Sequence, residues 1–254
     1  MSLLKVIDTD PGNIFKCGVC GYKNPKKPGL PEKARWFKDR IAEGLKIKIL
    51  YSEEDGTQGM IEYVPGEFCW RPVNAKGYMF IHCIFVGFKR QYKNQGYASK
   101  LLDICETDAR KGSCDGVAIV TRKSSFMAGK EIFLKRGYEI ADKAAPDFEL
   151  LAKRFNPEAD LPVFRITEPD YGDGLIIIRA DQCPYTLKNV AEIQQTAKEQ
   201  YGLTPRIVDL ETYKDAQNSP CAFGSFCILF NNEVIAEHPI SNGRFKNIMN
   251  KILN

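Results

Sequence analysis

The chain has 254 residues, of which 44% are hydrophobic and 27% are charged, with a formal net charge of +4. This composition is that of an ordinary globular protein, and the length allows one large domain or two modest ones. The small net charge does not favour nucleic acid as a partner. No apolar run approaches the roughly eighteen residues that span a bilayer, and the first residues lack the pattern of a secretory signal. We therefore expect a cytoplasmic protein that binds neither nucleic acid nor a membrane.

Nine cysteines are scattered along the chain. An odd number of cysteines without an export signal indicates reduced thiols, many of them acting as small buried hydrophobes. Cys17 and Cys20 form a Cys-x-x-Cys pair, which is half of a zinc site. A second pair is missing, and His82 and Cys83 lie in a predicted buried strand, where they are poorly placed to complete the site. We therefore predict no metal site.

The first half of the chain alternates helical and strand-like segments. After a poorly patterned stretch to about Pro31, a helix is predicted up to Gly44, because proline suits a first turn and glycine a helix end. Alternating or continuous apolar residues predict the strands, and the long run at 78–86 is typical of a central strand covered on both faces. The predicted strands span residues 45–51, 60–64, 78–86 and 116–120, with a turn at 53–59. Further helices are predicted from Ala98 to Lys111 and within 129–140, the second one running into a final strand.

The second half begins after a segment that contains three prolines and several acids, residues 153–174. We assign residues 1–155 to a first domain, 156–173 to a connector and 174–254 to a second, smaller α/β domain. In the second domain we predict strands at 175–180, 205–210, 226–231 and 233–238, and helices at 187–200 and 244–253. The fold class is therefore α/β (α+β), a mixed central sheet flanked by helices plus a small α/β domain.

A basic turn precedes the predicted helix at Ala98. The unpaired amides and the dipole of a helix N-terminus attract anions, and Gly96 places no side chain between an anion and those amides. Lys89, Arg90 and Lys93 add positive charge around the turn. The chemistry fits a pyrophosphate, although the same residues also suit an ordinary solvated loop.

In this context the residues resemble the GNAT superfamily of N-acetyltransferases. The signature of that family, Gln/Arg-x-x-Gly-x-Gly/Ala at a strand-to-helix turn, is matched with lysine in its first place, and the segment "FLKRGYE" is similar to a later motif of the family. The resemblance spans roughly residues 1–155 and implies acetyl-CoA as co-substrate. It implies that the pyrophosphate is held by the turn Lys93, Asn94, Gln95, Gly96, Tyr97 and Ala98.

The resemblance also indicates where the reacting groups lie. The strand before the turn splays to admit the pantetheine arm, which implies contacts with Ile84, Phe85 and Val86. Phe133 occupies the place where many members have a tyrosine that protonates the leaving sulfur. Phenylalanine cannot donate a proton, so either Ser125 or Tyr138 supplies it or the thiolate leaves unaided.

Glu67 and His82 are the candidate general bases. Histidine titrates in the useful range, but a histidine within an apolar strand is more often a satisfied core side chain. Glu67 lies in a turn-rich segment among aromatic residues, where an acceptor pocket could form, or where a carboxylate simply faces solvent. Both roles stay hypotheses.

The second domain resembles the thioredoxin-like fold. Cys183 is placed at a predicted helix start, which lowers a thiol pKa, and residues 183–186 are similar to the Cys-Pro-Tyr-Cys motif of glutaredoxins, with Thr186 in place of the second cysteine. Ser225 stands where the fold usually has a cis-proline. The domain is then either a monothiol redox unit, with Cys221 or Cys227 as partner, or a binding module.

The pairing of the two domains is similar to that of the YoaP-like acetyltransferases. We expect an N-acetyltransferase that acts on a small-molecule or peptide amine, with the second domain covering the acceptor side. The alternatives are a non-catalytic acyl-CoA-binding module and a redox protein that uses Cys183. An oligomer is compatible with each reading.

Overall fold

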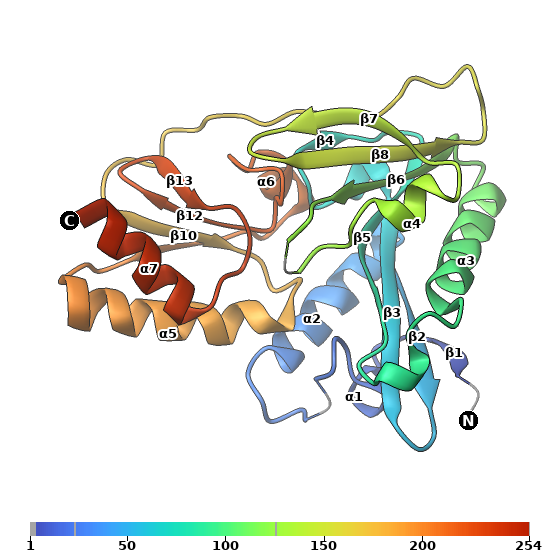
Figure 1. Ribbon diagram of the computed structural model, residues 1–254, viewed down its shortest axis with the longest axis horizontal. Helices are drawn as coiled ribbons and strands as arrows, with labels where there is room; N and C mark the ends of the chain where they lie inside the picture. The colour runs from blue at the N-terminus through green and yellow to red at the C-terminus, as the bar shows by residue number, and fades with distance from the viewer. Residues whose placement is uncertain (1–3, 23, 125, 254) are drawn as a thin grey trace.

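The computed structural model describes residues 4–22, 24–124 and 126–253. Two sheets organise the chain, each with helices packed against it (Figure 1). The first half forms a seven-stranded sheet, and the second half forms a four-stranded sheet beside it. This mixed α/β architecture confirms the predicted fold class at that level.

The large sheet has the strand order β1-β2-β3-β5-β6-β8-β7. Its neighbours are antiparallel except for β5 and β6, which run parallel. The strands are β1 (Lys5–Asp8), β2 (Lys46–Ser52), β3 (Gly56–Pro65), β5 (Tyr78–Val86), β6 (Gly116–Thr121), β7 (Glu139–Ala144) and β8 (Phe148–Arg154).

Helices cover both faces of this sheet. On one face Leu101 and Leu102 of α3 join Ile61 and Ile81 of the central strands in a buried cluster. The other face packs against α1, α2 and the second half of the chain (Figure 1). The helices and short 3-10 turns of this half are α1 (Ile14–Cys17), α2 (Leu30–Arg40), η1 (Ile41–Glu43), η2 (Gly66–Phe68), η3 (Arg90–Tyr92), α3 (Tyr97–Lys111) and α4 (Glu131–Leu134).

The helix predicted before Gly44 is confirmed as α2 followed by η1, and its ends follow local chemistry. Pro31 lies in the first turn, where its missing N–H costs no helical hydrogen bond. The Glu32 carboxylate accepts the Gly29 N–H at 2.7 Å, which satisfies an amide that the helix cannot pair. Gly44 adopts a left-handed conformation, with φ of 86°, and ends the segment.

The structure differs from the predictions for the first half in four places. The stretch before Pro31 contains β1 and α1, although its sequence shows no strong periodicity. β3 begins at Gly56, inside the predicted turn, because pairing with β2 and β5 extends the strand. The helix predicted within 129–140 is only the single turn α4. Gly137, with φ of 81°, turns the chain into β7, which pairs with β8, so the expected final strand is a hairpin.

The small sheet has the order β11-β10-β12-β13, with β10 and β11 parallel and the other neighbours antiparallel. Its four predicted strands are confirmed. The first of its helices begins three residues before the predicted start, because Pro184 suits a first helical position. The short α6 was not predicted. The elements are β10 (Leu175–Arg179), α5 (Pro184–Tyr201), β11 (Arg206–Asp209), α6 (Tyr213–Gln217), β12 (Phe226–Phe230), β13 (Glu233–Ala236) and α7 (Asn242–Leu253).

The two halves share one hydrophobic core and meet backbone against backbone. A Cβ at Gly29, the N-cap of α2, would lie 2.0 Å from the Pro184 carbonyl oxygen at the start of α5. A Cβ at Gly224 would lie 2.5 Å from the Trp70 carbonyl oxygen. Only glycine permits these approaches, so the halves are fitted closely to each other.

The segment between the sheets is not structureless. It contains β9 (Val163–Phe164), which pairs with β4 (Val73–Asn74) of the first half. The Phe164 N–H also donates to the Asp142 carboxylate at 2.8 Å. Among the helices of the described residues, none has the length and apolar character needed to cross a membrane.

Candidate active site

An opening in the large sheet lies at the centre of the candidate site. The parallel pairing of β5 with β6 covers only Tyr78–Ile81 and Gly116–Ile119, although β5 continues to Val86 and β6 to Thr121. Beyond Ile81 the two strands therefore separate, which leaves backbone groups of β5 that no longer face a paired strand. Such polar groups are available to an inserted ligand.

A β-bulge lies at the point where β5 leaves β6. In the ladder with β3, Glu62 pairs with Cys83 and Tyr63 pairs with Ile81, so His82 is an extra residue without a partner. A bulge breaks the alternation of side chains along a strand and redirects them. As a result both His82 and Cys83 line the same cavity.

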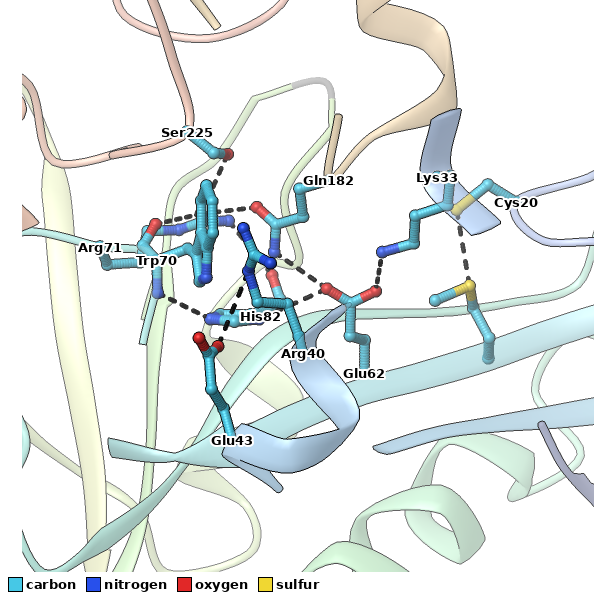
Figure 2. Close-up of polar contacts among 11 residues, drawn as sticks. Cys20, Lys33, Arg40, Glu43, Glu62, Trp70, Arg71, His82, Gln182 and Ser225 are labelled. Carbon is cyan, nitrogen blue, oxygen red and sulfur yellow. Dashed lines mark hydrogen bonds and ion pairs between the residues drawn. The ribbon is translucent and has the colours of Figure 1, made fainter. Parts of the chain in front are cut away.

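Glu62 is the centre of a buried polar network on this face (Figure 2). Its Oε2 accepts from the ammonium of Lys33, and its Oε1 accepts from Gln182 Nε2 at 2.9 Å. His82 Nδ1 lies 3.3 Å from the same Oε1. Burial alone would raise the pKa of Glu62, but Lys33 and then His82 outweigh it and lower that pKa to about 2.

His82 is held in one orientation and one tautomer. Its Nε2 accepts the Trp70 backbone N–H at 2.9 Å, so the ring proton of the neutral form is on Nδ1 and faces Glu62. Burial lowers the pKa of His82 to about 4, despite the opposing effect of Glu62. In this geometry the lone pair of the neutral histidine is already occupied by the Trp70 N–H.

Arg71 joins the two halves of the chain. Its Nη1 donates to the Trp70 carbonyl at 2.8 Å, to Gln182 Oε1 at 3.1 Å and to Ser225 Oγ at 3.2 Å. Its Nη2 donates to the His82 carbonyl at 3.3 Å. Burial lowers the pKa of Arg71 from its ordinary value. Figure 2 shows Arg71 and Glu62 on opposite sides of Gln182, which contacts both.

A cavity of about 280 Å³ lies between these elements, at the opening of the sheet. β3, β5 and β6 form one wall and the segment 126–128 forms another. The rest is closed by residues of the second half together with Cys20, Arg71 and Phe88 of the first. Most of its lining is apolar, and the large apolar side chains are Met60, Phe85, Phe88, Phe126, Met127 and Phe223. The site is therefore a compact, largely apolar chamber whose charged lining residues are Glu62 and Arg71.

Three thiols reach this cavity from distant parts of the sequence. Cys20, Cys83 and Cys183 all line it. Cys20 is hydrogen-bonded to Cys83, which lowers the pKa of Cys83 and raises that of Cys20. Cys20 of the Cys-x-x-Cys pair and Cys83 therefore lie together at this cavity, while Cys17 is not part of its lining. In the described part of the chain, no cluster of three His, Cys, Asp or Glu residues could hold a metal ion.

The basic turn lies where the strand-to-helix pattern predicts it. Gly96 is the N-cap of α3, with φ of 76°, and no side chain caps this end of the helix in the described residues. The side chains of Lys93, Asn94 and Gln95 are exposed. Lys89 is paired with Asp55 at 2.5 Å, which anchors the start of the turn. The amides of the first helical turn therefore remain available to an anion.

Of the other residues predicted to bind the cofactor, some line the cavity and some do not. Ile84 and Phe85 line the cavity, while Val86 and the half-buried Tyr97 and Ala98 lie outside its lining. Phe133 is 0% exposed and packs against Tyr138, so its side chain lies in the core.

The predicted acids and bases are mostly elsewhere. Glu67 is exposed on η2 and does not line the cavity, because the chain turns outward after β3. Tyr138 is buried on the α3 side, its hydroxyl 3.4 Å from Glu106, and burial raises its pKa well above the ordinary value. Ser125 lies outside the described residues.

Cys183 is the N-cap of α5, as predicted, but its electrostatics differ from the expectation. Burial raises the pKa of Cys183 to about 11, which outweighs the hydrogen bond from the Tyr185 amide. The apolar cavity therefore opposes the thiolate that a helix N-terminus favours.

Sequence reasoning missed Lys33, Glu62 and Arg71. A signal was present for the first two, because Lys33 falls on the apolar face of its helix and Glu62 falls within the apolar run "MIEYV". A charged residue at a core position is rarely buried without a partner, so such positions are candidates for a buried pair. Their pairing with each other becomes visible only when α2 lies over β3.

Comparison with known proteins places this architecture in a family. The chain is 30% identical over 253 residues to a Bacillus subtilis (strain 168) protein described as the uncharacterized N-acetyltransferase YoaP, covering 97% of this chain and 98% of that protein. This chain belongs to the YoaP-like N-acetyltransferases. The YoaP-like family model matches residues 206–247, so the family is also represented in the second half.

Solved structures of acetyltransferases are more distant from this YoaP-like protein. A GNAT-family acetyltransferase from Staphylococcus aureus Mu50 is 12% identical, with 60% of this chain and 99% of that chain covered and a TM-score of 0.43. PaiA N-acetyltransferase from Thermoplasma acidophilum, in complex with coenzyme A, is 11% identical, with 60% and 99% covered and a TM-score of 0.42. At these scores the two likenesses decide neither the fold nor the site.

Proposed function

We propose that this YoaP-like protein transfers the acetyl group of acetyl-CoA to the primary amine of a small molecule held in the cavity between the two halves. The observation that supports it best is the separation of β5 from β6 beyond Ile81, directly beside that cavity. The thioester arm enters through this opening, contacting Ile84 and Phe85, and the amine approaches from the cavity. The cofactor and the acceptor thus meet at the sheet.

The pyrophosphate of acetyl-CoA is bound at the turn from Lys93 to Ala98. Support comes from the uncapped N-terminus of α3 and from Gly96, where an added Cβ would have no neighbouring atom within 4 Å. Backbone amides and the helix dipole favour a negative charge there.

Catalysis in this proposal rests on positioning and on a polarised carbonyl, and not on a strong base. With pKa values lowered to about 2 and about 4, Glu62 and His82 hold protons too weakly to deprotonate an amine near neutral pH. The reactive amine is therefore the neutral form that the substrate itself supplies.

We propose further that residues 1–155 form the acetyltransferase domain, 156–173 a connector and 174–254 a thioredoxin-like domain. The order β11-β10-β12-β13, with α5 between two parallel strands and α7 after the last hairpin, supports that assignment. The role of the second domain in this proposal is to close the acceptor cavity, since its residues Gln182 and Phe223 are part of the cavity wall. The raised pKa of Cys183 favours this role over thiol redox chemistry.

A thermal-shift measurement with acetyl-CoA tests the cofactor site. A ligand that binds only the folded protein stabilises it by about 4 kcal/mol at a thousandfold excess over its dissociation constant. We expect a clear rise of Tm for the natural sequence and a loss of that rise in Gly96→Glu, whose carboxylate repels the pyrophosphate.

Gly96→Asn is the matched control. Asparagine tolerates a positive φ and adds no charge, so most of the ligand-induced shift is expected to persist. Release of CoA thiol with an amine panel then measures transfer. A natural-sequence protein that shows no Tm shift with acetyl-CoA contradicts the proposal.

A further inference from the structure

The buried charges around the cavity do not balance. Two positive groups, Lys33 and Arg71, stand against one carboxylate, Glu62, and all three are at least nine-tenths buried. His82 is neutral in its hydrogen-bonded tautomer. The neighbouring charges cancel in pairs, Arg40 with Glu43 and Arg35 with Asp181. The excess is one buried positive charge, which is costly unless an anion compensates it.

Arg71 is the group that carries the excess, because Lys33 is already bonded to Glu62. A guanidinium has five N–H donors, and the bonds of Arg71 use Nη1 and a single bond of Nη2. Among the described residues, its Nε–H and its second Nη2–H have no acceptor. Nε and Nη2 share one edge of the guanidinium, and such an edge binds a carboxylate through two parallel hydrogen bonds.

A hydrogen bond to β5 holds Arg71 close to the opening between β5 and β6, where the proposed transfer takes place. Its Nη2 bonds the carbonyl of His82, the bulge residue that directly follows the last paired residue, Ile81. A carboxylate on Arg71 therefore lies beside the opening between β5 and β6. In an α-amino acid only one carbon separates the carboxylate from the amine, so the amine is brought to that opening.

The rest of the cavity limits the size and polarity of the acceptor's side chain. Its volume of about 280 Å³ is just below the usual range of ligand pockets, roughly 300–1,000 Å³, so it suits a small molecule. The large side chains Met60, Phe85, Phe126 and Phe223 offer apolar contacts and no partner for additional charges. A polyamine or an aminoglycoside would add positive charge next to an unbalanced arginine, which is unfavourable.

We propose that the acceptor is an α-amino acid with an apolar side chain, whose carboxylate binds Arg71. This inference rests on the proposed acetyltransferase function and defines its substrate class. The amine nitrogen attacks the thioester carbonyl, the N–C bond forms as the C–S bond breaks, and the proton lost by nitrogen passes to the departing CoA thiolate. The products are an N-acetyl amino acid and CoA.

Matched pairs of amines test the proposal on the unmodified protein. Each pair differs only in the carboxylate: L-phenylalanine with 2-phenylethylamine, L-leucine with 3-methylbutylamine and L-methionine with 3-methylthiopropylamine. Because the carboxylate also lowers the pKa of the neighbouring amine, kcat/KM is compared per neutral amine. On that basis a charged hydrogen-bonded contact predicts a kcat/KM about tenfold or more higher for the amino acid in at least one pair. Calorimetric binding of each compound to the CoA-bound protein is measured alongside turnover.

The outcomes separate this inference from the proposed function. Amines that are acetylated as well as their amino acids overturn the inference and leave the function intact, as expected if a Cys83 thiolate already balances Arg71. Amino acids that bind the CoA complex more tightly than their paired amines but are never acetylated by acetyl-CoA overturn the function, and with it the acceptor role, and leave only the carboxylate contact with Arg71 standing. If no amino acid binds or reacts, the inference is wrong.

A variant locates the effect. In Arg71→Gln we expect the preference for the amino acid over its paired amine to fall to about onefold, whatever the overall loss of activity. The ratio within one variant is insensitive to general damage to the fold. Arg35→Gln, which removes an exposed arginine on α2, is expected to keep the full preference. An unchanged preference in Arg71→Gln overturns the assignment of the carboxylate to Arg71.

Discussion

At the residue scale, the site is defined by charged groups that the apolar core encloses. Glu62 is stable there as an anion only because Lys33 and His82 compensate it. The same burial keeps His82 neutral. The residues whose type suits catalysis, Glu67 and His82, are respectively outside the cavity and already hydrogen-bonded. The environment of a residue, and not its type, therefore decides whether it belongs to the polar network at the cavity.

The His82 pKa predicts how stability depends on pH. This pKa is lowered from 6.5 to about 4 on folding, so the unfolded chain binds the proton first as the pH falls. The contribution of His82 is present above pH 6.5 and is lost between 6.5 and about 4, with a slope of up to about 1.4 kcal/mol per pH unit. The pKa of Glu62 is lowered from 4.5 to about 2, so Glu62 reduces the free energy of unfolding only below about pH 4.5.

Urea unfolding between about pH 6.5 and about pH 4.5 therefore isolates the histidine. We expect the free energy of unfolding to decrease with acidification less steeply in His82→Gln than in the natural sequence, even though the variant is less stable at neutral pH. Parallel curves for the two proteins would show that His82 does not titrate in this way.

The pH dependence of catalysis follows from the same two residues. Because neither Glu62 nor His82 is a base near neutral pH, kcat/KM for an amine should rise with pH until the pKa of the substrate amine itself. The measurement uses two acceptors whose amine pKa values differ. We expect the midpoint of the profile to move with the acceptor. A fixed midpoint near about pH 6.5 for both acceptors would instead indicate an enzymatic base.

At the element scale, the position of α2 against α5 and of β5 against β6 creates the site. α2 brings Lys33 over β3, and the N-terminus of α5 brings Cys183 and Tyr185 to the cavity. The Tyr185 hydroxyl donates to the Cys20 carbonyl at 2.7 Å, which ties the loop after α1 to the second half. The cavity is therefore shaped by contacts between elements and not by one loop.

Gly29→Ala tests how closely these elements fit. The added Cβ meets the Pro184 carbonyl at 2.0 Å and the backbone has φ of 104°, so both a clash and a strained conformation result. We expect a loss of unfolding free energy of about 3 kcal/mol or more, measured by urea denaturation.

Gly202→Ala is the matched control for that substitution. Gly202 has φ of 65°, and a Cβ added there would meet nothing within 4 Å, so only the conformational cost of about 1–2 kcal/mol applies. Equal losses in the two variants would mean that α2 and α5 are not in close contact.

At the scale of the whole molecule, the two halves form one cooperative unit. Buried residues of both sheets belong to a single core, and Arg71 and Glu62 of the first half share Gln182 of the second. Separation of the halves would leave these buried charges with missing partners, which costs several kcal/mol.

We therefore predict a single unfolding transition for the entire chain. In calorimetry the van't Hoff enthalpy should equal the calorimetric enthalpy, and tryptophan fluorescence should give the same midpoint as far-ultraviolet circular dichroism. Two resolved transitions would show that the second half is an independent domain. If acetyl-CoA binds to the first half as proposed, it should raise the midpoint seen by both probes.

The sequence by itself determined most of the secondary structure. Apolar runs such as 78–86 and 175–180 specify buried strands, and Gly44, Gly96 and Gly202 mark helix ends, because these signals depend on neighbours along the chain. The basic turn before α3 and the position of Cys183 at a helix start were also readable in this way.

Only the tertiary structure decided the cavity and the buried charges around it. The bulge at His82 depends on the register between β3 and β5, and the pairing of Lys33 with Glu62 depends on where α2 lies over the sheet. The pKa of Cys183 is raised because segments distant in sequence exclude water from it. Register, helix position and burial arise from long-range contacts, which local residue patterns do not encode.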